Sequence, residues 1–494
     1  MVITEAVGSG GTTDPAVSTA AHGGSGSVEA LEIANPAVAT IGQILCVLVP
    51  VAVWFAPLGL APNTQHGLAI VCFMVIAWIT QAMEYALAGF IGCYLFWALG
   101  VVKFEVAFSG FANDTAWFLF AAFLFGQMAS NSGLARRLAY SVMVRVGSTY
   151  SRILLGMIAI DFLLTFIVPS GIARVVILAA IALALIEAFN AKRGENIPRG
   201  MFLILTYTGN IFDKMIIAGA GTITATGMMA KAGVQVSWGE WLLAFLPCSI
   251  VTVLVAWWMT IRMYPPETER LDGGSAHFRE ELRKMGPWSP AEVKSAILLG
   301  FAILVWLTDF YHHIPPAMIA LGVGLFALLP RIGVLTAEDM RRVNYMPVFF
   351  VAAAVSMGNV LAATKGLDLL THWVFAGIEP FLTSTVMTTI VMYWAGFIYH
   401  FFLASEISML GTSMPLVMEF AKNHGMNPLL LGMIWTFAAG GKLFAYQSGV
   451  LIVGHSYGYF SARDLVRVGW WLTVAEFAIL LLLVPFYWPL LGIQ

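Results

Sequence analysis

Charged side chains are scarce in this sequence: 11% of its 494 residues are Asp, Glu, Lys or Arg, and the formal net charge is −2. Without an excess of Lys and Arg there is no basic face to neutralise phosphates, which excludes a nucleic-acid partner. Cysteines are few as well, and all four lie within apolar runs, so neither a disulfide framework nor a zinc site is indicated. We interpret them as packing residues.

The sequence also has too few polar residues for a soluble domain, because 60% of its residues are hydrophobic. A membrane span needs about 20 apolar residues, and such runs recur between residues 40 and 491. They predict an all-α polytopic membrane protein in a lipid bilayer, with about 11 transmembrane helices. Residues 1–36 are rich in Gly, Ser, Thr and Ala and contain no Lys or Arg. They lack a signal-peptide core, so we expect a disordered tail.

Basic residues gather in five clusters along the chain. The clusters lie within residues 136–152, 192–199, 262–284, 331–342 and 463–467. Cytoplasmic loops are enriched in Lys and Arg, so we expect all five clusters inside, with a cytoplasmic N-terminus and an external C-terminus. Two clusters flank segment 151–190, which must then enter and leave from the cytoplasm. By the same parity, segment 380–421 enters and leaves from outside.

Residues Val168 to Arg174 interrupt an apolar run with Pro169 and Gly171. Proline cannot donate a backbone hydrogen bond and glycine adopts almost any backbone angle, so one helix should end here and another begin. Irregular backbone at membrane depth is tolerated only against protein or a water-filled cavity. The break therefore predicts a binding site at the buried tip of a re-entrant hairpin, although two full spans joined by a tight turn would share its parity.

The two halves of the chain resemble each other at an offset of 228–235 residues. Lys214 and Gly221, for example, correspond to Lys442 and Gly449. Such matches suggest a duplication. Each copy holds five spans and one hairpin, and this odd number turns the second copy upside down. Inverted repeats with discontinuous helices at mid-membrane are the architecture of secondary transporters.

This organisation predicts four parts. They are a tail (1–36), a first repeat (37–262) with hairpin 151–190, a charged cytoplasmic loop (263–292), and a second repeat (293–494) with hairpin 380–421.

Five motifs, in order and spacing, make residues 40–491 resemble the divalent anion/sodium symporter family. That family includes sodium-coupled dicarboxylate carriers, citrate/succinate exchangers and plastid oxoglutarate/malate translocators. The motifs are Pro169-Ser170-Gly171-Ile172-Ala173-Arg174, Ala404-Ser405-Glu406-Ile407, Ser109-Gly110-Phe111, Tyr264-Pro265-Pro266-Glu267, and Val453-Gly454 with Arg463-Asp464-Leu465-Val466. The resemblance implies a homodimer, in which a transport domain moves like an elevator against a static scaffold.

The chain departs from this family at both hairpin tips. Family tips usually read Ser-Asn-Thr, whose oxygens meet sodium and the substrate carboxylate, whereas here they read Ser170-Gly171-Ile172 and Ser405-Glu406-Ile407. A hard cation needs oxygen ligands, and Gly and Ile side chains supply none. We therefore predict degenerate sodium sites, with exchange or proton coupling in place of sodium symport.

Arg174 lies one helical turn past Ser170 on the same face. A guanidinium clamps a carboxylate through two parallel hydrogen bonds, and ionisable groups this deep in a membrane are functional by default. Contact with the substrate is therefore predicted. The alternative is a structural bridge to Asp161.

Lys214 and Lys442 stand near two predicted unwound stretches, 219–222 and 447–449, where each ammonium could replace a sodium ion. Alternatively, Lys214 pairs with Asp213 and Lys442 with Glu406. The Glu406 carboxylate would repel an anionic substrate, so it must be paired or protonated. One hypothesis is a pair with Lys442 that exchanges a proton, and the other is a static salt bridge.

The predicted substrate-binding residues lie at the two tips and the two unwound stretches. They are Ser170, Gly171, Ile172, Arg174, Lys214, Gly221, Thr222, Ser405, Glu406, Ile407, Lys442, Gln447, Ser448 and Gly449.

The prediction is a secondary transporter for small di- or tricarboxylates, of the C4-dicarboxylate, oxoglutarate or citrate type, in a bacterial inner membrane and without a cofactor. A sulfate or oxyanion carrier of the same fold is the first alternative. The second is an integral membrane enzyme. The sequence shows no nucleophile with its base, no metal-ligand cluster and no phosphate-binding loop, so we expect no enzymatic activity.

Overall fold

The computed structural model describes residues 36–494 apart from Gln81, Ser148, Pro169, Phe189, 270–273, 402–405 and Gln494. The elements of this described part are helices, and none is a β-strand. The prediction of an all-α polytopic membrane protein is thereby confirmed. The predicted tail lies outside the described residues except for Pro36, and Ser405 at the second tip lies outside them too.

Apolar helices occupy each run that was predicted to span the membrane. Those of 18 residues or more include α1 (Pro36–Phe55), α2 (Pro62–Thr80), α11 (Trp238–Met263), α13 (Pro290–Leu307), α17 (Met346–Ala363) and α23 (Ala462–Leu482). Shorter ones are α3 (Tyr85–Ala98) and α15 (Pro316–Ala327). A helix of 18 residues is about 27 Å long, close to the thickness of the hydrocarbon core.

Polar capping residues fix where several spans begin. Ser237, Ser289 and Ser461 each form a capping box with an acid three residues later, at the starts of α11, α13 and α23. The serine hydroxyl accepts a bond from one orphan backbone N–H, and the acid accepts from another. These helices therefore start where their sequences can satisfy the groups that a helix end leaves free.

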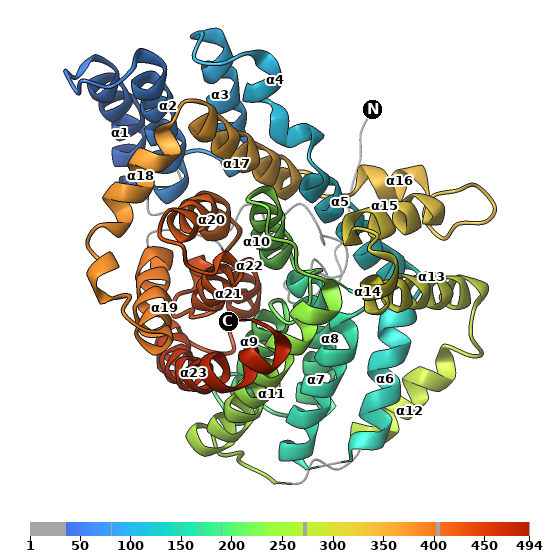
Figure 1. The fold of residues 1–494 in the computed structure, drawn as a ribbon. Coiled ribbons are helices and arrows are strands. Elements are labelled where there is room, and N and C mark those ends of the chain that lie inside the picture. Colours follow the sequence, from blue (N-terminus) through green and yellow to red (C-terminus); the bar gives the residue numbers. More distant parts are fainter. Residues whose placement is uncertain are drawn as a thin grey trace, which may run out of the picture. The chain divides into compact units, whose positions relative to one another are not determined.

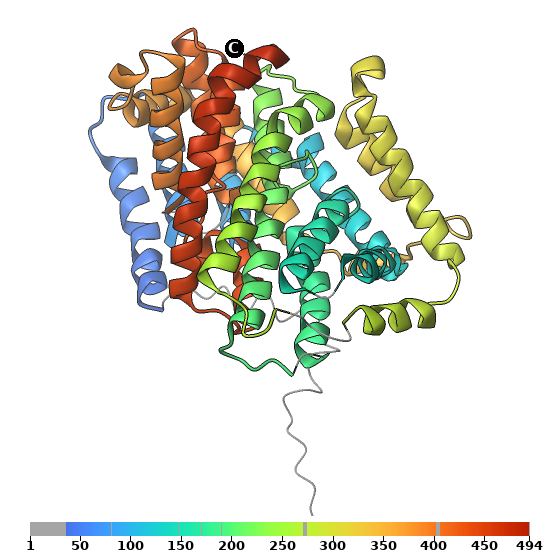
Figure 2. The ribbon, with the colours of Figure 1, turned by 90° about the horizontal axis from the view of Figure 1, so that it is seen from below.

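Helices α5 (Asp114–Asn131) and α6 (Leu134–Val146) are joined by a bend of 61°. Gly133 makes the bend with a φ of 86°, a left-handed conformation that glycine adopts without strain. In Figure 2, α6 is seen nearly end-on whereas α23 stands upright, so α6 lies across the direction of that span. The chain thus leaves the first four spans along a transverse helix.

Arg137 fastens this transverse helix to the start of α13. Its Nε and Nη2 donate to Glu292 at 2.7 and 3.0 Å, and further bonds reach carbonyls of residues 285–287. Bidentate, charge-assisted bonds of this kind are among the stronger ones in proteins. The charged segment 263–292 also contains a helix, α12 (Gly274–Lys284), which packs on α6.

The predicted break at Val168–Arg174 is confirmed. Helix α7 (Tyr150–Thr165) ends before it, and α8 (Gly171–Ala188) begins within it. The corresponding arms of the second hairpin are α19 (Thr385–Phe401) and α20 (Glu406–Asn423).

Two further spans are discontinuous, as predicted at 219–222 and 447–449, although Gly449 itself already belongs to a helix. Residues 213–219 separate α9 (Asn196–Phe212) from α10 (Ala220–Lys231), and 439–448 separate α21 (Pro428–Ala438) from α22 (Gly449–Ser456). The second break includes the short 3-10 turn η4 (Ala445–Gln447). In Figure 1, α9, α10, α20, α21 and α22 lie together, with α1–α3 at the edge of the view. The broken helices therefore form the centre of this part of the chain.

The first break begins earlier than predicted, because residues 220–222 already belong to α10. The Thr222 hydroxyl, at 2.8 and 2.9 Å, donates to the carbonyls of Ile216 and Gly219. The Ile216 carbonyl lies in the break, and the Gly219 carbonyl also accepts the first bond of α10, from the Ile223 N–H at 2.9 Å. The prediction that residues 220–222 are unwound was wrong, because the Thr222 side chain stabilises a helix that already begins at Ala220.

Candidate functional site

One arm of each predicted hairpin packs against half of a broken span that is distant in the sequence: α20 packs against α10, and α8 against α22. A Cβ atom placed on Gly221 of α10 would lie 2.6 Å from Oε1 of Glu406 at the start of α20. A Cβ placed on Gly449 of α22 would lie 2.7 Å from the side chain of Ile172 in α8. Only glycine permits such approaches. The predicted residues are therefore brought together in two pairs, Gly221 with Glu406 and Gly449 with Ile172.

The starts of α8, α10, α20 and α22 are the four helix ends that meet here. A helix N-terminus carries unpaired N–H groups and about half a positive charge. The N-cap of α10 is Gly219, which offers no side chain to occupy those N–H groups. Four such ends favour a negatively charged ligand between them.

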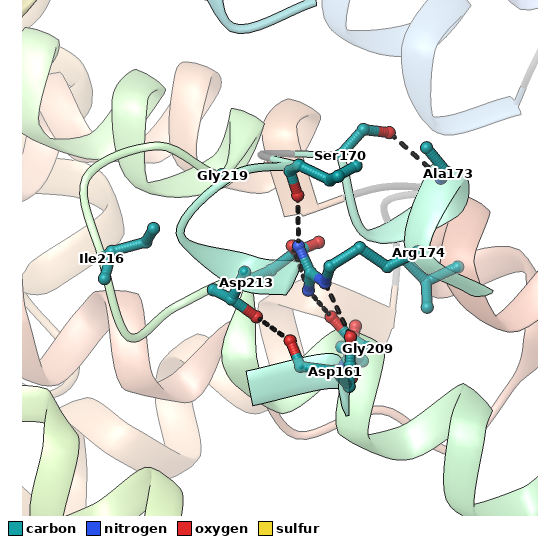
Figure 3. Close-up of polar contacts among 12 residues, drawn as sticks. Asp161, Ser170, Ala173, Arg174, Gly209, Asp213, Ile216 and Gly219 are labelled. Carbon is teal, nitrogen blue, oxygen red and sulfur yellow. Dashed lines mark hydrogen bonds and ion pairs between the residues drawn. The ribbon is translucent and has the colours of Figure 1, made fainter. Parts of the chain in front are cut away.

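Arg174 is fully buried behind the first tip and bonds to its own protein. Its Nε donates to Asp161 at 2.7 Å and its Nη2 to Asp213 at 2.9 Å (Figure 3). Nη1 donates to the Val168 carbonyl at 3.1 Å, and Nη2 also to the Gly209 carbonyl at 2.8 Å. These bonds use four of the five guanidinium N–H donors. The structural bridge to Asp161 is thus confirmed, and a substrate contact through the remaining donor stays a prediction.

Lys442 lies in the second break and joins α20 to α9. Its Nζ donates to Glu406 Oε2 and to Asn210 Oδ1 of α9, both at 2.5 Å. The pair that the sequence suggested between Lys442 and Glu406 is therefore present. Asn210 was not predicted, and its place in the apolar helix α9 offered little signal.

Lys214 turns away from Asp213 and Glu406. Its ammonium bonds to the carboxyl of Glu476 in α23 and faces the Phe437 ring, whose centroid is 5.5 Å away. The suggested pair with Asp213 is therefore wrong, because Asp213 bonds to Arg174. Glu476 was missed, although it is the lone charged residue of the run 469–491, and ionisable residues inside membranes mark partners or sites.

The remaining predicted polar residues hold the backbone of the tips and breaks. Ser170 Oγ accepts from the Ala173 N–H at 3.3 Å, and Ser448 Oγ accepts from the Val450 N–H at 3.3 Å. Gln447 Oε1 accepts from two backbone N–H groups of its own break, at 2.7 and 2.9 Å. Ser170, Gly171 and Ile407 lie at the starts of α8 and α20.

Exposure separates two of the four acids, Asp213 and Glu406, from the three cations. The side chains of Arg174, Lys214 and Lys442 are 0–2% exposed, whereas those of Asp213 and Glu406 are 20% and 12% exposed. The sequence predicted that the cations contact the substrate. In the structure, the carboxyls of Asp213 and Glu406 are more exposed than any of the three cations. The three cations are paired with four carboxylates, those of Asp161, Asp213, Glu406 and Glu476. This buried cluster of seven groups carries a formal charge of −1 when all of them are ionised.

Two cavities of about 280 and 220 Å³ lie elsewhere. The first is between residues 382–388 and 426–431, and the second between residues 111–120 and 345–352. Neither is lined by a residue of the predicted set. Among the described residues, no group of three or more His, Cys, Asp or Glu side chains is placed to hold a metal ion.

Gly221→Ala is expected to reduce transport by about tenfold while the protein still folds. The added methyl would press on a Glu406 side chain that Lys442 holds in place, and overpacking of this kind costs about 1–3 kcal/mol. Initial uptake rates in proteoliposomes would show the loss. Gly322→Ala is the matched control, because nothing lies within 4 Å of its added methyl. Equal rates for the two variants would contradict the close approach of α10 and α20.

Comparison with known proteins gives one family match. The protein-family model described as "Sodium:sulfate symporter transmembrane region" matches residues 37–494. Thus the match covers the whole described part of the chain except Pro36.

Three relatives show the degree of similarity. A membrane protein of Cupriavidus necator is 28% identical over 470 residues, covering 88% of this chain and 89% of the relative. The citrate/succinate antiporter of Escherichia coli is 24% identical over 489 residues, covering 92% and 98%. The L-tartrate/succinate antiporter of Escherichia coli is 24% identical over 375 residues, covering 74% and 76%.

Proposed function

The chain belongs to the divalent anion/sodium symporter family, the sodium:sulfate symporters of the matched model, and on this basis we propose that it exchanges small di- or tricarboxylates across a membrane. The observation that carries the proposal is the meeting of four helix N-termini from two repeats at one place. The partial positive charges there suit the carboxylates of a substrate. Two similar proteins are named as antiporters of succinate with citrate or tartrate.

Independence from sodium follows from what occupies the oxygen-rich positions at the tips. The guanidinium of Arg174 takes the carbonyl oxygens of Val168 and Gly209, and the ammonium of Lys442 takes oxygens of Asn210 and Glu406. Carbonyl, amide and carboxylate oxygens are the ligands that a hard cation needs. In this proposal, fixed side-chain cations replace the coupling sodium ions. Lys442 keeps the role predicted for it, and Arg174 replaces the sodium ion that Lys214 was predicted to replace.

The wider arrangement is proposed from the sequence and the family. Residues 37–262 and 293–494 form two inverted repeats with re-entrant hairpins, in a homodimer whose transport domain moves like an elevator. The protein resides in a bacterial inner membrane with its N-terminus cytoplasmic and its C-terminus outside. The three relatives described above are bacterial proteins.

Uptake into proteoliposomes tests this proposal. We expect labelled succinate to enter vesicles preloaded with succinate, malate, tartrate or citrate at a rate at least tenfold above that of empty vesicles. An imposed sodium gradient should leave the rate unchanged. Vesicles without protein give the background. A strict requirement for inward sodium would contradict exchange without sodium.

Sulfate is the second candidate substrate, because the matched family model takes its description from sodium:sulfate symporters. Competition decides between the two: unlabelled malate should inhibit succinate uptake, whereas equimolar sulfate should not. Inhibition by sulfate alone would favour the oxyanion carrier. Chemical conversion of the substrate without any transport would instead support the membrane enzyme considered from the sequence.

A further inference from the structure

Asp213 stands at the junction of both repeats with the most exposed carboxyl of the buried cluster. It follows α9 in the first break, and its Oδ1 accepts from Arg174 at 2.9 Å. Its Oδ2 lies against the first tip so closely that a Cβ atom on Gly171 would collide with it. The side chain is 20% exposed, against 0%, 5% and 12% for the other three acids of the cluster. Asp213 is therefore the acid that a solute can reach most readily.

The cations of the cluster are divided unequally among the acids. Glu476 has Lys214 to itself, and Glu406 has Lys442. Asp161 and Asp213 share the single guanidinium of Arg174. One of these two acids is thus an excess negative charge. Asp161 is fully buried and has the shorter bond to Arg174, 2.7 Å against 2.9 Å for Asp213, so we assign the excess charge to Asp213.

The groups that face Asp213 come from every element packed around it. They are Arg174 of α8, Asp161 of α7 through the shared guanidinium, Glu406 of α20, and Lys442 of the second break. Lys214, next to it in the chain, is turned toward Glu476. Asp213 therefore sees two positive and two negative neighbours, and its own ionisation makes the cluster negative.

An arriving dicarboxylate would add two negative charges beside Asp213 and Glu406. Two like charges 4 Å apart repel by about 4 kcal/mol at the effective dielectric constant of a protein surface, and more in a drier site. Glu406 is already neutralised by Lys442. One proton on Asp213 would leave three cations facing three carboxylates, which removes the excess charge before the substrate binds.

We propose that Asp213 takes up one proton from the aqueous side with each dicarboxylate that binds and returns it when the dicarboxylate leaves. This inference rests on the proposed transport function and names the residue that couples protons to it. The proton binds a carboxylate oxygen, and no covalent bond in the substrate changes. Affinity should then be highest at low pH and fall as the pH rises.

The test measures protons directly. The purified full-length protein, in weakly buffered detergent solution with a pH indicator, is titrated with succinate over a pH range in which succinate stays fully ionised. We expect uptake of about one proton per succinate bound, and a dissociation constant that rises toward tenfold per pH unit. Asp213→Asn should bind succinate with no proton uptake and with an affinity independent of pH.

Two further variants show whether the effect belongs to this residue. Glu406→Gln leaves Asp213 intact but already balances three cations with three carboxylates, so it should take up less than one proton per succinate. Glu338→Gln, at an acid half-exposed in a surface ion pair, should match the wild type. Proton uptake of about one per succinate that persists in Asp213→Asn, or that is lost in Glu338→Gln, would overturn the proposal.

Wild-type protein alone also gives a decisive result if Asp213→Asn does not fold. Infrared difference spectra should show the carbonyl stretch of a newly protonated carboxyl group when succinate is added. Succinate binding with neither this band nor proton uptake would refute the role of Asp213 and leave the transport proposal standing. If none of succinate, malate, tartrate and citrate binds at any pH, the transport proposal itself fails.

Discussion

Arg174→Met should abolish transport and destabilise the folded protein by about 3–5 kcal/mol, the usual cost of breaking a buried ion pair by removing one partner. The guanidinium is fully buried and bonds to two acids from different helices and to two backbone carbonyls. Without it, Asp161 becomes a buried charge with no cation beside it. The first tip also loses the bonds that tie it to α7 and α9.

Thermal unfolding in detergent and uptake in proteoliposomes measure the two effects. Arg174→Lys is the informative control, because it keeps the charge but cannot make four bonds in a fixed planar fork. It should fold better than Arg174→Met and still transport poorly. The double variant Arg174→Met with Asp161→Asn should recover stability and stay inactive. A stable, active Arg174→Met would show that the guanidinium does not hold the tip.

Lys214→Met should destabilise the protein by a comparable amount, about 3–5 kcal/mol, since it leaves Glu476 buried without its partner. The double variant Lys214→Met with Glu476→Leu should recover most of that loss, because well-packed apolar residues often replace a buried pair at little cost. A double-mutant cycle of unfolding free energies gives the coupling between the two sites.

The exposed pair between Lys284 and Glu281 supplies the comparison for this cycle. Its side chains are 62% and 30% exposed, and exposed pairs of this kind are screened by solvent and salt. Lys284→Met should leave the unfolding midpoint nearly unchanged. If Lys214→Met behaved in the same way, Lys214 and Glu476 would not form the buried bridge that ties the first break to α23.

The sequence was sufficient to locate the breaks in the helices but not the partners of their charges. Proline and glycine act on the backbone nearest to them, so the interruption at 168–174 could be read directly. The pairing of Lys442 with Glu406 was among the alternatives because both belong to one repeat. Lys214 and Glu476 lie 262 residues apart, and only tertiary packing decides that they meet.

The sharing of Arg174 shows a second limit of sequence reasoning. Spacing placed Arg174 one turn from Ser170 and suggested a clamp for the substrate carboxylate. In the folded chain the guanidinium points inward, because Asp161 and Asp213 approach it from two other helices. Which face of a buried helix a side chain occupies depends on what packs there. The composition of the two repeats does not contain that information.

The distance in sequence between Lys214 and Glu476 also bears on how the protein is made. At roughly 5–20 residues per second, tens of seconds separate the synthesis of Lys214 from that of its counter-ion. During that interval the ribosome-bound chain carries an ammonium that the finished protein buries. Residues 213–219, with Lys214, must therefore stay near water or beside the insertion machinery until α23 has been synthesised.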